Sequence, residues 1–286
     1  MRLLAGGLPC ASMNAQRAKA QTLRSLHSGP TLLILPNAWD VASAMVIAGT
    51  GARAIATSSA GVAFALGYPD GQRISRDEML DMVRRIAAAV DLPVSADVEG
   101  GYGATPEAAA ETARGVLAAG AVGMNLEDAA EVGELLPLEL QADRLRAARA
   151  AADAAGVPLV INGRTDAFAA RGIPAEARLA EAVRRANAYL AAGADCAFVP
   201  FVKEREDIAR LAREIRGPLN ILAKPGSPPL AEMKRLGVRR VSVGSAIALA
   251  AYGRARRAAT ELLGSGTYTE MEDGVPYAEM QELLAP

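Results

Sequence analysis

Two carboxylates, separated by a single residue, lie at the end of an expected strand, directly before a glycine-rich turn. They are Asp97 and Glu99, in the segment 95–103, SADVEGGYG. In an extended chain, side chains two positions apart point to the same side, so both carboxylates should face one region. Carboxylate oxygens are the ligands that a hard dication such as Mg2+ prefers. Taken alone, the segment fits either a metal site or an ordinary acidic loop.

Short apolar segments alternate with alanine-rich segments of helical length along most of the chain. Eight strand-then-helix units favour a parallel sheet covered by helices, and their crossovers close most naturally into a (β/α)8 barrel, the TIM barrel of the α/β class. A doubly wound sheet is the alternative, but its usual GxGxxG turn after the first strand is absent. The predicted strands are 31–35, 53–57, 93–97, 122–126, 158–162, 196–199, 219–223 and 240–243. The predicted helices are 15–26, ahead of the repeat, then 39–48, 75–90, 106–119, 138–155, 175–192, 204–215, 229–236 and 245–263.

Barrel enzymes carry their catalytic groups at the C-terminal ends of the strands. The two acids above follow the third predicted strand, Glu127 follows the fourth and Arg164 follows the fifth. The second strand is followed by 57–61, TSSAG, whose hydroxyls and backbone amides can face an anion, and then by Asp70. Acids from separate strands with one guanidinium facing them predict a site for a metal ion and an oxyanion.

Composition excludes several classes of function. The chain has 286 residues, a formal net charge of -1 and no basic run, so neither nucleic acid nor a membrane surface is an expected partner. No apolar run approaches the roughly 20 residues that span a bilayer. Cys10 and Cys196 are the only cysteines, which argues against a disulfide framework or a zinc site and fits the reducing cytoplasm. The single histidine, His27, excludes a multi-histidine metal site; we expect it on a surface loop.

The two ends of the chain differ from the repeating middle. We interpret residues 1–12 as a disordered extension, or as the product of an upstream start codon, and 13–286 as a single barrel domain. Residues 264–286 include Tyr268, Met271 and Tyr277, which a closed barrel has no room to bury. We expect this tail to pack on another subunit of a homo-oligomer.

The chain resembles the isocitrate lyase/phosphoenolpyruvate mutase superfamily, as a 2-methylisocitrate lyase-like or phosphonomutase-like member. The resemblance runs from about residue 15 to residue 263. The motifs on which the resemblance rests are, in chain order, LPNAWDVASA, TSSAGVA, GYPDG, ADVEGGYG, NLEDA, INGRTDA and RRVSVGSA. It implies a barrel that exchanges C-terminal helices between subunits, as a dimer or a tetramer.

The resemblance also implies roles for matching positions. Arg164 matches the arginine that contacts the substrate's oxygens, and Asn220 resembles a further pocket contact. The segment that binds the substrate carboxylate corresponds to Ser58, Ser59 and Ala60. The acids that hold Mg2+ (or Mn2+), directly or through water, correspond to Asp70, Asp97, Glu99 and Glu127. We place Arg164, Glu127 and Asp70 among the catalytic residues.

One loop departs from the family pattern. Isocitrate and methylisocitrate lyases carry a K-[KR]-C-G motif after the fourth strand, and phosphonopyruvate enzymes carry Lys and Asn there. In this chain the loop reads AAEVGELLPLEL, without Cys, Lys or Asn. Lyases also place a Glu at the end of the sixth strand, where Val199 and Pro200 stand here. The residues that select the reaction therefore match no named member.

These features predict a Mg2+-dependent carbon–carbon lyase or decarboxylase that acts on a small 2-oxo or 2-hydroxy carboxylate through an enolate. Cleavage beside a carbonyl leaves negative charge on oxygen, which a dication stabilises. One alternative is P–C chemistry of the phosphoenolpyruvate mutase or phosphonopyruvate hydrolase type. Another is a non-catalytic barrel that binds a small carboxylate.

Overall fold

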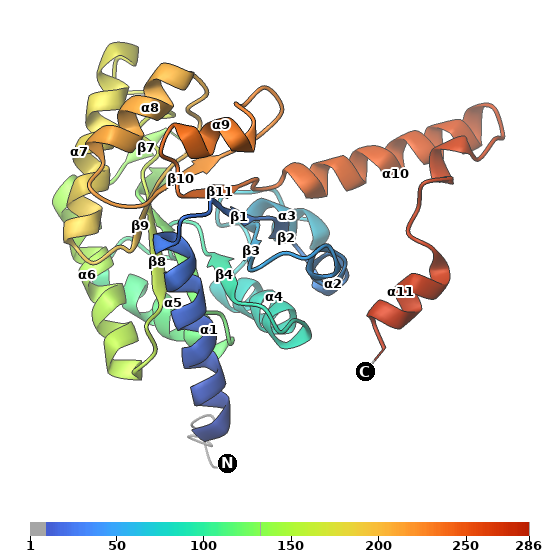
Figure 1. Ribbon diagram of the computed structural model, residues 1–286, viewed down its shortest axis with the longest axis horizontal. Coiled ribbons are helices and arrows are strands. Elements are labelled where there is room, and N and C mark those ends of the chain that lie inside the picture. Colours follow the sequence, from blue (N-terminus) through green and yellow to red (C-terminus); the bar gives the residue numbers. More distant parts are fainter. Residues whose placement is uncertain (1–9, 132, 286) are drawn as a thin grey trace.

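A computed structural model gives the structure of residues 10–131 and 133–285, in which a nine-stranded parallel sheet curls into a nearly closed barrel (Figure 1). The strand order is β1-β11-β10-β9-β8-β5-β4-β3-β2. The strands are β1 (Leu33–Leu35), β2 (Asn37–Ala38), β3 (Ile55–Thr57), β4 (Val94–Asp97), β5 (Gly123–Glu127), β8 (Val160–Arg164), β9 (Cys196–Val199), β10 (Leu219–Leu222) and β11 (Arg240–Ser242). The predicted barrel of the α/β class is confirmed.

The barrel closes through its first strand, which runs past the predicted 31–35 and is split in two at Pro36. Proline lacks the N–H that a continuous strand would use. The part before it, β1, pairs with β11, and the part after it, β2, pairs with β3. The carbonyl of Pro36 still accepts a hydrogen bond from the Ala56 N–H at 3.1 Å. The nine strands therefore correspond to the eight predicted β/α units.

Helices surround the sheet, and several begin where the sequence has capping residues. Asp40 and Ser43 form a capping box at α2, as Ser75 and Glu78 do at α4, while Thr105 caps α5. These caps satisfy backbone N–H groups that have no partner within the helix. The helices are α1 (Cys10–Ser28), α2 (Val41–Gly49), α3 (Ser59–Ala65), α4 (Arg76–Ala89), α5 (Pro106–Ala118), α6 (Leu138–Ala155), α7 (Arg178–Ala191), α8 (Arg205–Glu214), α9 (Leu230–Arg235), α10 (Ala246–Gly264) and α11 (Tyr277–Leu283), with 3-10 turns η1 (Ala175–Ala177) and η2 (Thr269–Met271). None of them, within the part of the chain described, is both long and apolar enough to cross a membrane.

Two segments that were predicted to be loops contain a helix and a hairpin in the structure. The segment after β3 was expected to be a loop, but α3 begins there because the Ser58 hydroxyl accepts a hydrogen bond from the Gly61 N–H at 3.1 Å. The loop after β5 contains an antiparallel hairpin of β6 (Ala129–Glu131) and β7 (Glu134–Leu135). Both elements lie at the C-terminal end of the barrel, where the site is expected.

Helix α1 covers the opposite end of the barrel, beside the strand starts (Figure 1). It begins at Cys10, five residues before the predicted 15, so that the expected 1–12 extension lies largely outside the described residues. Gln16 Nε2 donates to the carbonyl oxygens of Leu117 at 2.7 Å and Ala121 at 3.2 Å. A Cβ on Gly123, at the start of β5, would lie 2.8 Å from Leu23 Cδ2. This close contact seats α1 against the sheet.

His27 is buried, so its predicted place on a surface loop is wrong. Its Nδ1 lies 2.8 Å from the Leu23 carbonyl oxygen, and its Nε2 lies 3.4 Å from Nη1 of the buried Arg240. Burial, followed by the charge of Arg240, lowers the pKa of His27 to about 4. Its ring is therefore a neutral core group at pH 7.

The C-terminal arm, α10 through α11, extends away from the barrel (Figure 1). It presents apolar side chains to solvent: Leu263 is 87% exposed and Tyr277 is 81% exposed. Its end approaches α2, since a Cβ on Gly49 would lie 3.7 Å from Leu283 Cδ2. Exposed apolar surface of this kind is typical of an interface.

We predict that the arm packs on a second copy of the chain, giving a dimer or a tetramer. Light scattering should report at least twice the 29.6 kDa of one chain, because burial of the arm's apolar side chains favours association. Removal of residues 264–286 should shift the population toward smaller particles and lower the thermal midpoint. A particle of single-chain mass at every concentration would contradict this assembly.

We predict that His27 makes the folded state sensitive to acid. The unfolded ring binds a proton near pH 6.5, whereas the folded ring resists it until about 4, so stability falls as the pH drops between these values and by about 3 kcal/mol in full. Carboxyl groups whose pKa is raised by folding add stability as the pH falls, which opposes the effect of His27. The natural chain is therefore compared with His27→Gln, which keeps those carboxyl groups and has no titrating side chain at position 27. Urea unfolding should show that the free energy of unfolding falls more steeply with decreasing pH in the natural chain than in the variant. Equal pH dependence of the two chains would count against this prediction.

Candidate active site

A cavity of about 690 Å3 opens at the C-terminal ends of the strands. It gathers side chains from the loops after β3, β4, β5, β8 and β9. Its lining is Ser59, Asp70, Gly71, Gln72, Arg73, Glu99, Glu127, Ala129, Gly133, Arg164, Asp166, Ala169, Arg171 and Phe201. A second cavity, of about 710 Å3, lies beyond the β6–β7 hairpin and has a largely different lining. The predicted acids surround the first cavity.

Asp97 ends β4 and is buried just beneath this lining. Its Oδ2 accepts hydrogen bonds from the backbone N–H of Ser59 at 3.0 Å and from its hydroxyl at 2.8 Å. Its Oδ1 accepts from Asn125 Nδ2 at 3.2 Å. Donors from the start of α3 and from the neighbouring strand β5 therefore fix the carboxylate in one orientation.

Glu99 faces the cavity from a strained backbone. Its φ is 50°, in the left-handed region that residues with a Cβ seldom adopt. Its Oε2 accepts a hydrogen bond from the Gln72 N–H at 2.7 Å. Burial first, and then the charges of Asp97 and Asp70, raise the pKa of Glu99 to about 7. Burial and the charge of Asp97 also raise the pKa of Asp70, so the three acids share one crowded region.

The turn after Glu99 is held from below by Arg144, a buried residue of α6. Its Nη2 donates to the carbonyl oxygen of Gly100 and, at 3.1 Å, to that of Gly103. Gly101 has φ of 78°, and a Cβ there would lie 2.8 Å from Leu126 Cδ1. The glycines thus let the turn pass close to the barrel wall, where Arg144 can reach its carbonyl groups.

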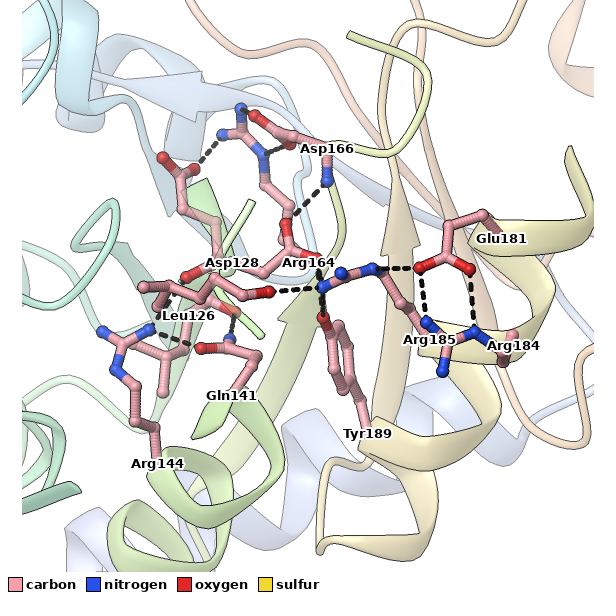
Figure 2. Close-up of polar contacts among 12 residues, drawn as sticks. Leu126, Asp128, Gln141, Arg144, Arg164, Asp166, Glu181, Arg184, Arg185 and Tyr189 are labelled. Atoms are coloured by element: carbon pink, nitrogen blue, oxygen red, sulfur yellow. Dashed lines mark hydrogen bonds and ion pairs between the residues drawn. The ribbon is translucent and has the colours of Figure 1, made fainter. Parts of the chain in front are cut away.

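Glu127, Arg164 and Asp166 form a buried ion triad at the ends of β5 and β8, in the lining of the cavity, and Figure 2 shows Arg164 and Asp166 facing each other. Arg164 Nη1 lies 2.5 Å from Glu127 Oε2, while its Nε and Nη2 donate to the two Asp166 oxygens at 2.6 and 2.8 Å. Burial lowers the pKa of Arg164, but Glu127 and Asp166 raise it by more, so it stays charged. Burial raises the pKa of Glu127 well above its usual range, against the opposing charge of Arg164.

A second buried network holds the triad in place, and its centre is Asp128 (Figure 2). The Asp128 carboxylate accepts from the Asp166 N–H at 2.9 Å, from the Tyr189 hydroxyl at 2.6 Å and from Arg185 Nη1 at 3.1 Å. Arg185 also donates to the Leu136 carbonyl oxygen at 2.9 Å, at the base of the hairpin. Helix α7 therefore fixes both the Arg164 loop and the hairpin.

The residues expected to bind substrate are only partly at the cavity. Of the expected carboxylate-binding residues Ser58, Ser59 and Ala60, only Ser59 belongs to the lining. Asn220 is buried inside the barrel, where its Nδ2 donates to Ser242 Oγ at 3.2 Å. Asn220 therefore lies outside the cavity lining, in contrast to the predicted pocket contact.

Four residues of the lining were not predicted from the sequence. Gln72 bonds Glu99 and accepts from the Tyr102 N–H at 2.8 Å. Phe201 follows β9, and its ring centroid lies 5.8 Å from the Arg164 guanidinium carbon. Arg73 and Arg171 are isolated arginines in long loops. A glutamine, an aromatic ring and two loop arginines have no spacing that marks them.

The donor chemistry of the site suits a hard dication, although its geometry is not that of a closed cage. Among the described residues, no three acidic, histidine or cysteine side chains come close enough to hold a metal ion together. Burial and like charge nevertheless raise the pKa of Glu99 and Asp70. A nearby cation would favour the ionised carboxylates and so lower both pKa values. Mg2+ commonly takes one or two carboxylates and completes its shell with water. The residues present fit such a hydrated ion.

Comparison with known proteins identifies the family. The family model for phosphoenolpyruvate phosphomutase matches residues 23–263. The chain belongs to this family, within the isocitrate lyase/phosphoenolpyruvate mutase superfamily. An oxaloacetate decarboxylase of Rhodopseudomonas palustris (strain BisB18) is 31% identical over 276 residues, 94% of this chain and 90% of that protein.

Solved structures of relatives share the fold over nearly the whole chain. A Burkholderia cenocepacia protein described as a lyase or mutase has a TM-score of 0.88 and 38% identity, and the match covers 96% of this chain and 98% of that one. An oxaloacetate acetylhydrolase in complex with its product oxalate has a TM-score of 0.83 and 26% identity, with 93% of each chain covered. The relatives with named activities are lyases, decarboxylases, hydrolases and mutases.

Proposed function

We propose that this chain is a Mg2+-dependent carbon–carbon lyase or decarboxylase that acts on a small 2-oxo or 2-hydroxy carboxylate, with Mn2+ as an alternative ion. The observation that carries the proposal is the gathering of acids and Arg164 around one cavity at the C-terminal ends of the strands. The activities of its relatives support the reaction class. The bond broken would lie beside a carbonyl, and its cleavage would leave an enolate intermediate.

Asp97, Glu99, Asp70 and Glu127 are the residues we propose to hold the ion, directly or through water. A bound dication offsets their charge and stabilises negative charge that develops on a substrate oxygen. The orientation of Asp97 is already fixed by Ser59 and Asn125. Little reorganisation is then needed when substrate enters.

Arg164 keeps part of its donor capacity for substrate. A guanidinium has five N–H donors, and the contacts with Glu127 and Asp166 engage three of its nitrogens once each. The remaining N–H groups can donate to a substrate oxygen, while the ion pairs prevent the side chain from turning away. We propose that the Ser58–Ala60 segment binds the substrate's own carboxylate through the Ala60 N–H at the start of α3. The Ser58 and Ser59 N–H groups already donate to the Ala38 carbonyl oxygen and to Asp97.

The proposal predicts that Asp97→Asn loses activity because one fixed carboxylate is removed from the ion site. Release of pyruvate or glyoxylate would be followed over a panel of small hydroxy- and oxo-acids with Mg2+, and we expect EDTA to abolish the reaction. The variant should fall by roughly a hundredfold or more in kcat/KM, as lost transition-state charge stabilisation typically does.

The matched control is Asp143→Asn, which removes one carboxylate from the exposed face of α6, where Asp143 pairs with Arg146. This control should keep its activity. Turnover that survives EDTA, or an Asp97→Asn variant as active as the control, would contradict the proposal. Ion binding without turnover of any panel member would favour a non-catalytic carboxylate-binding barrel.

A further inference from the structure

The turn that follows β4 is strained at two residues that carry side chains. Glu99 has φ of 50° and Tyr102 has φ of 56°, both in the left-handed region that residues with a Cβ seldom adopt. A backbone of this kind persists only when its surroundings hold it. The position of the Glu99 carboxylate therefore depends on contacts that other elements make with the turn.

Two buried side chains hold the carbonyl groups of this turn. Arg144 Nη2 donates to the Gly100 carbonyl oxygen and, at 3.1 Å, to that of Gly103. The Thr112 hydroxyl donates to the Gly101 carbonyl oxygen at 2.8 Å. Arg144 comes from α6 and Thr112 from α5, and both are completely buried. They hold the turn from the protein interior and leave its cavity side free.

The same guanidinium also reaches the end of β5. Arg144 Nη1 donates to the Glu127 carbonyl oxygen at 3.2 Å and to Gln141 Oε1, and Gln141 Nε2 donates to the Leu126 carbonyl oxygen at 3.2 Å. Arg144 and Gln141 both point from α6 toward this strand (Figure 2). The Glu127 N–H donates in turn to the Glu99 carbonyl oxygen at 3.2 Å. One side chain thus ties together the two segments that carry Glu99 and Glu127.

A buried guanidinium is a costly way to fill this position. The partners of Arg144 among the described residues are all uncharged oxygens. Burial lowers the pKa of Arg144, which reflects the cost of keeping a cation out of water. A methionine would fill a similar volume without that cost. What the guanidinium adds is a rigid plane of strong donors aimed at both acid-bearing segments.

We propose that Arg144 is a positioning residue that fixes the spacing of the Glu99 and Glu127 carboxylates and so makes the ion site select Mg2+ over the larger Ca2+. The inference rests on the proposed function, in which these acids hold the ion. Mg2+ demands nearly octahedral oxygen ligands at about 2.0–2.1 Å, whereas Ca2+ accepts oxygens at about 2.3–2.6 Å in flexible geometry. A turn that cannot relax favours the smaller ion, and a loosened turn lets the carboxylates move apart and admits Ca2+.

Calorimetric titration of the metal-free protein with Mg2+ and with Ca2+ tests this role. The natural chain should bind Mg2+ more tightly. In Arg144→Met this preference should fall about tenfold, the factor that corresponds to loss of one charge-assisted hydrogen bond. Arg144→Lys keeps the charge without the planar donors and should keep only part of the preference. A merely structural role would weaken both ions by the same factor and leave the ratio of their affinities unchanged.

Arg149→Met is the matched control, because Arg149 lies on the same helix and also holds backbone carbonyl groups. Its donors reach the Gly193 oxygen at 3.1 Å and the Leu159 oxygen at 2.9 Å, at the opposite end of the barrel from the cavity. This variant should keep the natural preference for Mg2+. Thr112→Val removes the other side-chain donor to the turn and should lower the preference by a smaller factor. It tests the same claim if Arg144→Met does not fold.

Hydrogen exchange reports on the turn without any ion. The Gly101 N–H donates to the Val98 carbonyl oxygen at 2.8 Å, inside the segment that Arg144 holds. Its exchange should be at least tenfold faster in Arg144→Met than in the natural chain and unchanged in Arg149→Met, because only the first variant frees the turn to open. Equal protection of this amide in both variants would overturn the positioning role.

The ion titrations separate the inference from the proposed function. An unchanged ratio of Mg2+ to Ca2+ affinity in Arg144→Met, an equal fall in Arg149→Met, or a natural chain that binds Ca2+ as tightly as Mg2+ overturns the inference and leaves the proposed function standing. A fall confined to the Arg144 and Thr112 variants, in a protein that turns over no acid of the panel, overturns the proposed function and leaves the inference. A natural chain that binds neither ion overturns both.

Discussion

The buried carboxylate of Asp128 is the interaction on which the geometry of the cavity depends. It joins the end of β5, the loop that carries Asp166 and helix α7 through three hydrogen bonds. A buried charge is tolerated only when it is paired and hydrogen-bonded, and loss of a partner typically costs about 3–5 kcal/mol. The Asp128 backbone carbonyl also accepts from the Leu136 N–H at 2.8 Å, which closes the base of the hairpin. Arg164 and the hairpin are consequently positioned by one network that does not itself line the cavity.

Charge at the cavity is divided between two groups of side chains with different roles. Asp97, Glu99 and Asp70 lie close enough for burial and mutual repulsion to raise the pKa of Glu99 to about 7. Arg164 is held between two carboxylates and contributes direction more than net charge. Such a site is suited to a dication at the acids. The proposed lyase chemistry follows from this division.

The sequence predicted the barrel and the strand-end acids because both follow from local patterns. Asp97, Glu127 and Arg164 each end a buried strand, and a parallel barrel brings all strand ends to one mouth. Features that depend on distant contacts were missed. His27 belongs to a polar stretch of the sequence, yet it is buried in the last helical turn of α1, where Arg240, 213 positions away, meets its ring. Tyr189 and Asp128 are separated by 61 positions, and the place of Arg171 depends on a hairpin that the loop's composition did not reveal.

The central claim is that the acids at the barrel mouth hold a divalent cation next to a bound carboxylate. Anomalous diffraction from crystals grown with Mn2+ and oxalate tests it most directly, because Mn2+ scatters anomalously and occupies oxygen-ligand sites that suit Mg2+. We expect a single strong peak inside the cavity, between the Asp97 and Glu99 carboxylates and the oxalate. No peak in the cavity at millimolar Mn2+, or oxalate bound there with the ion elsewhere, would contradict the account.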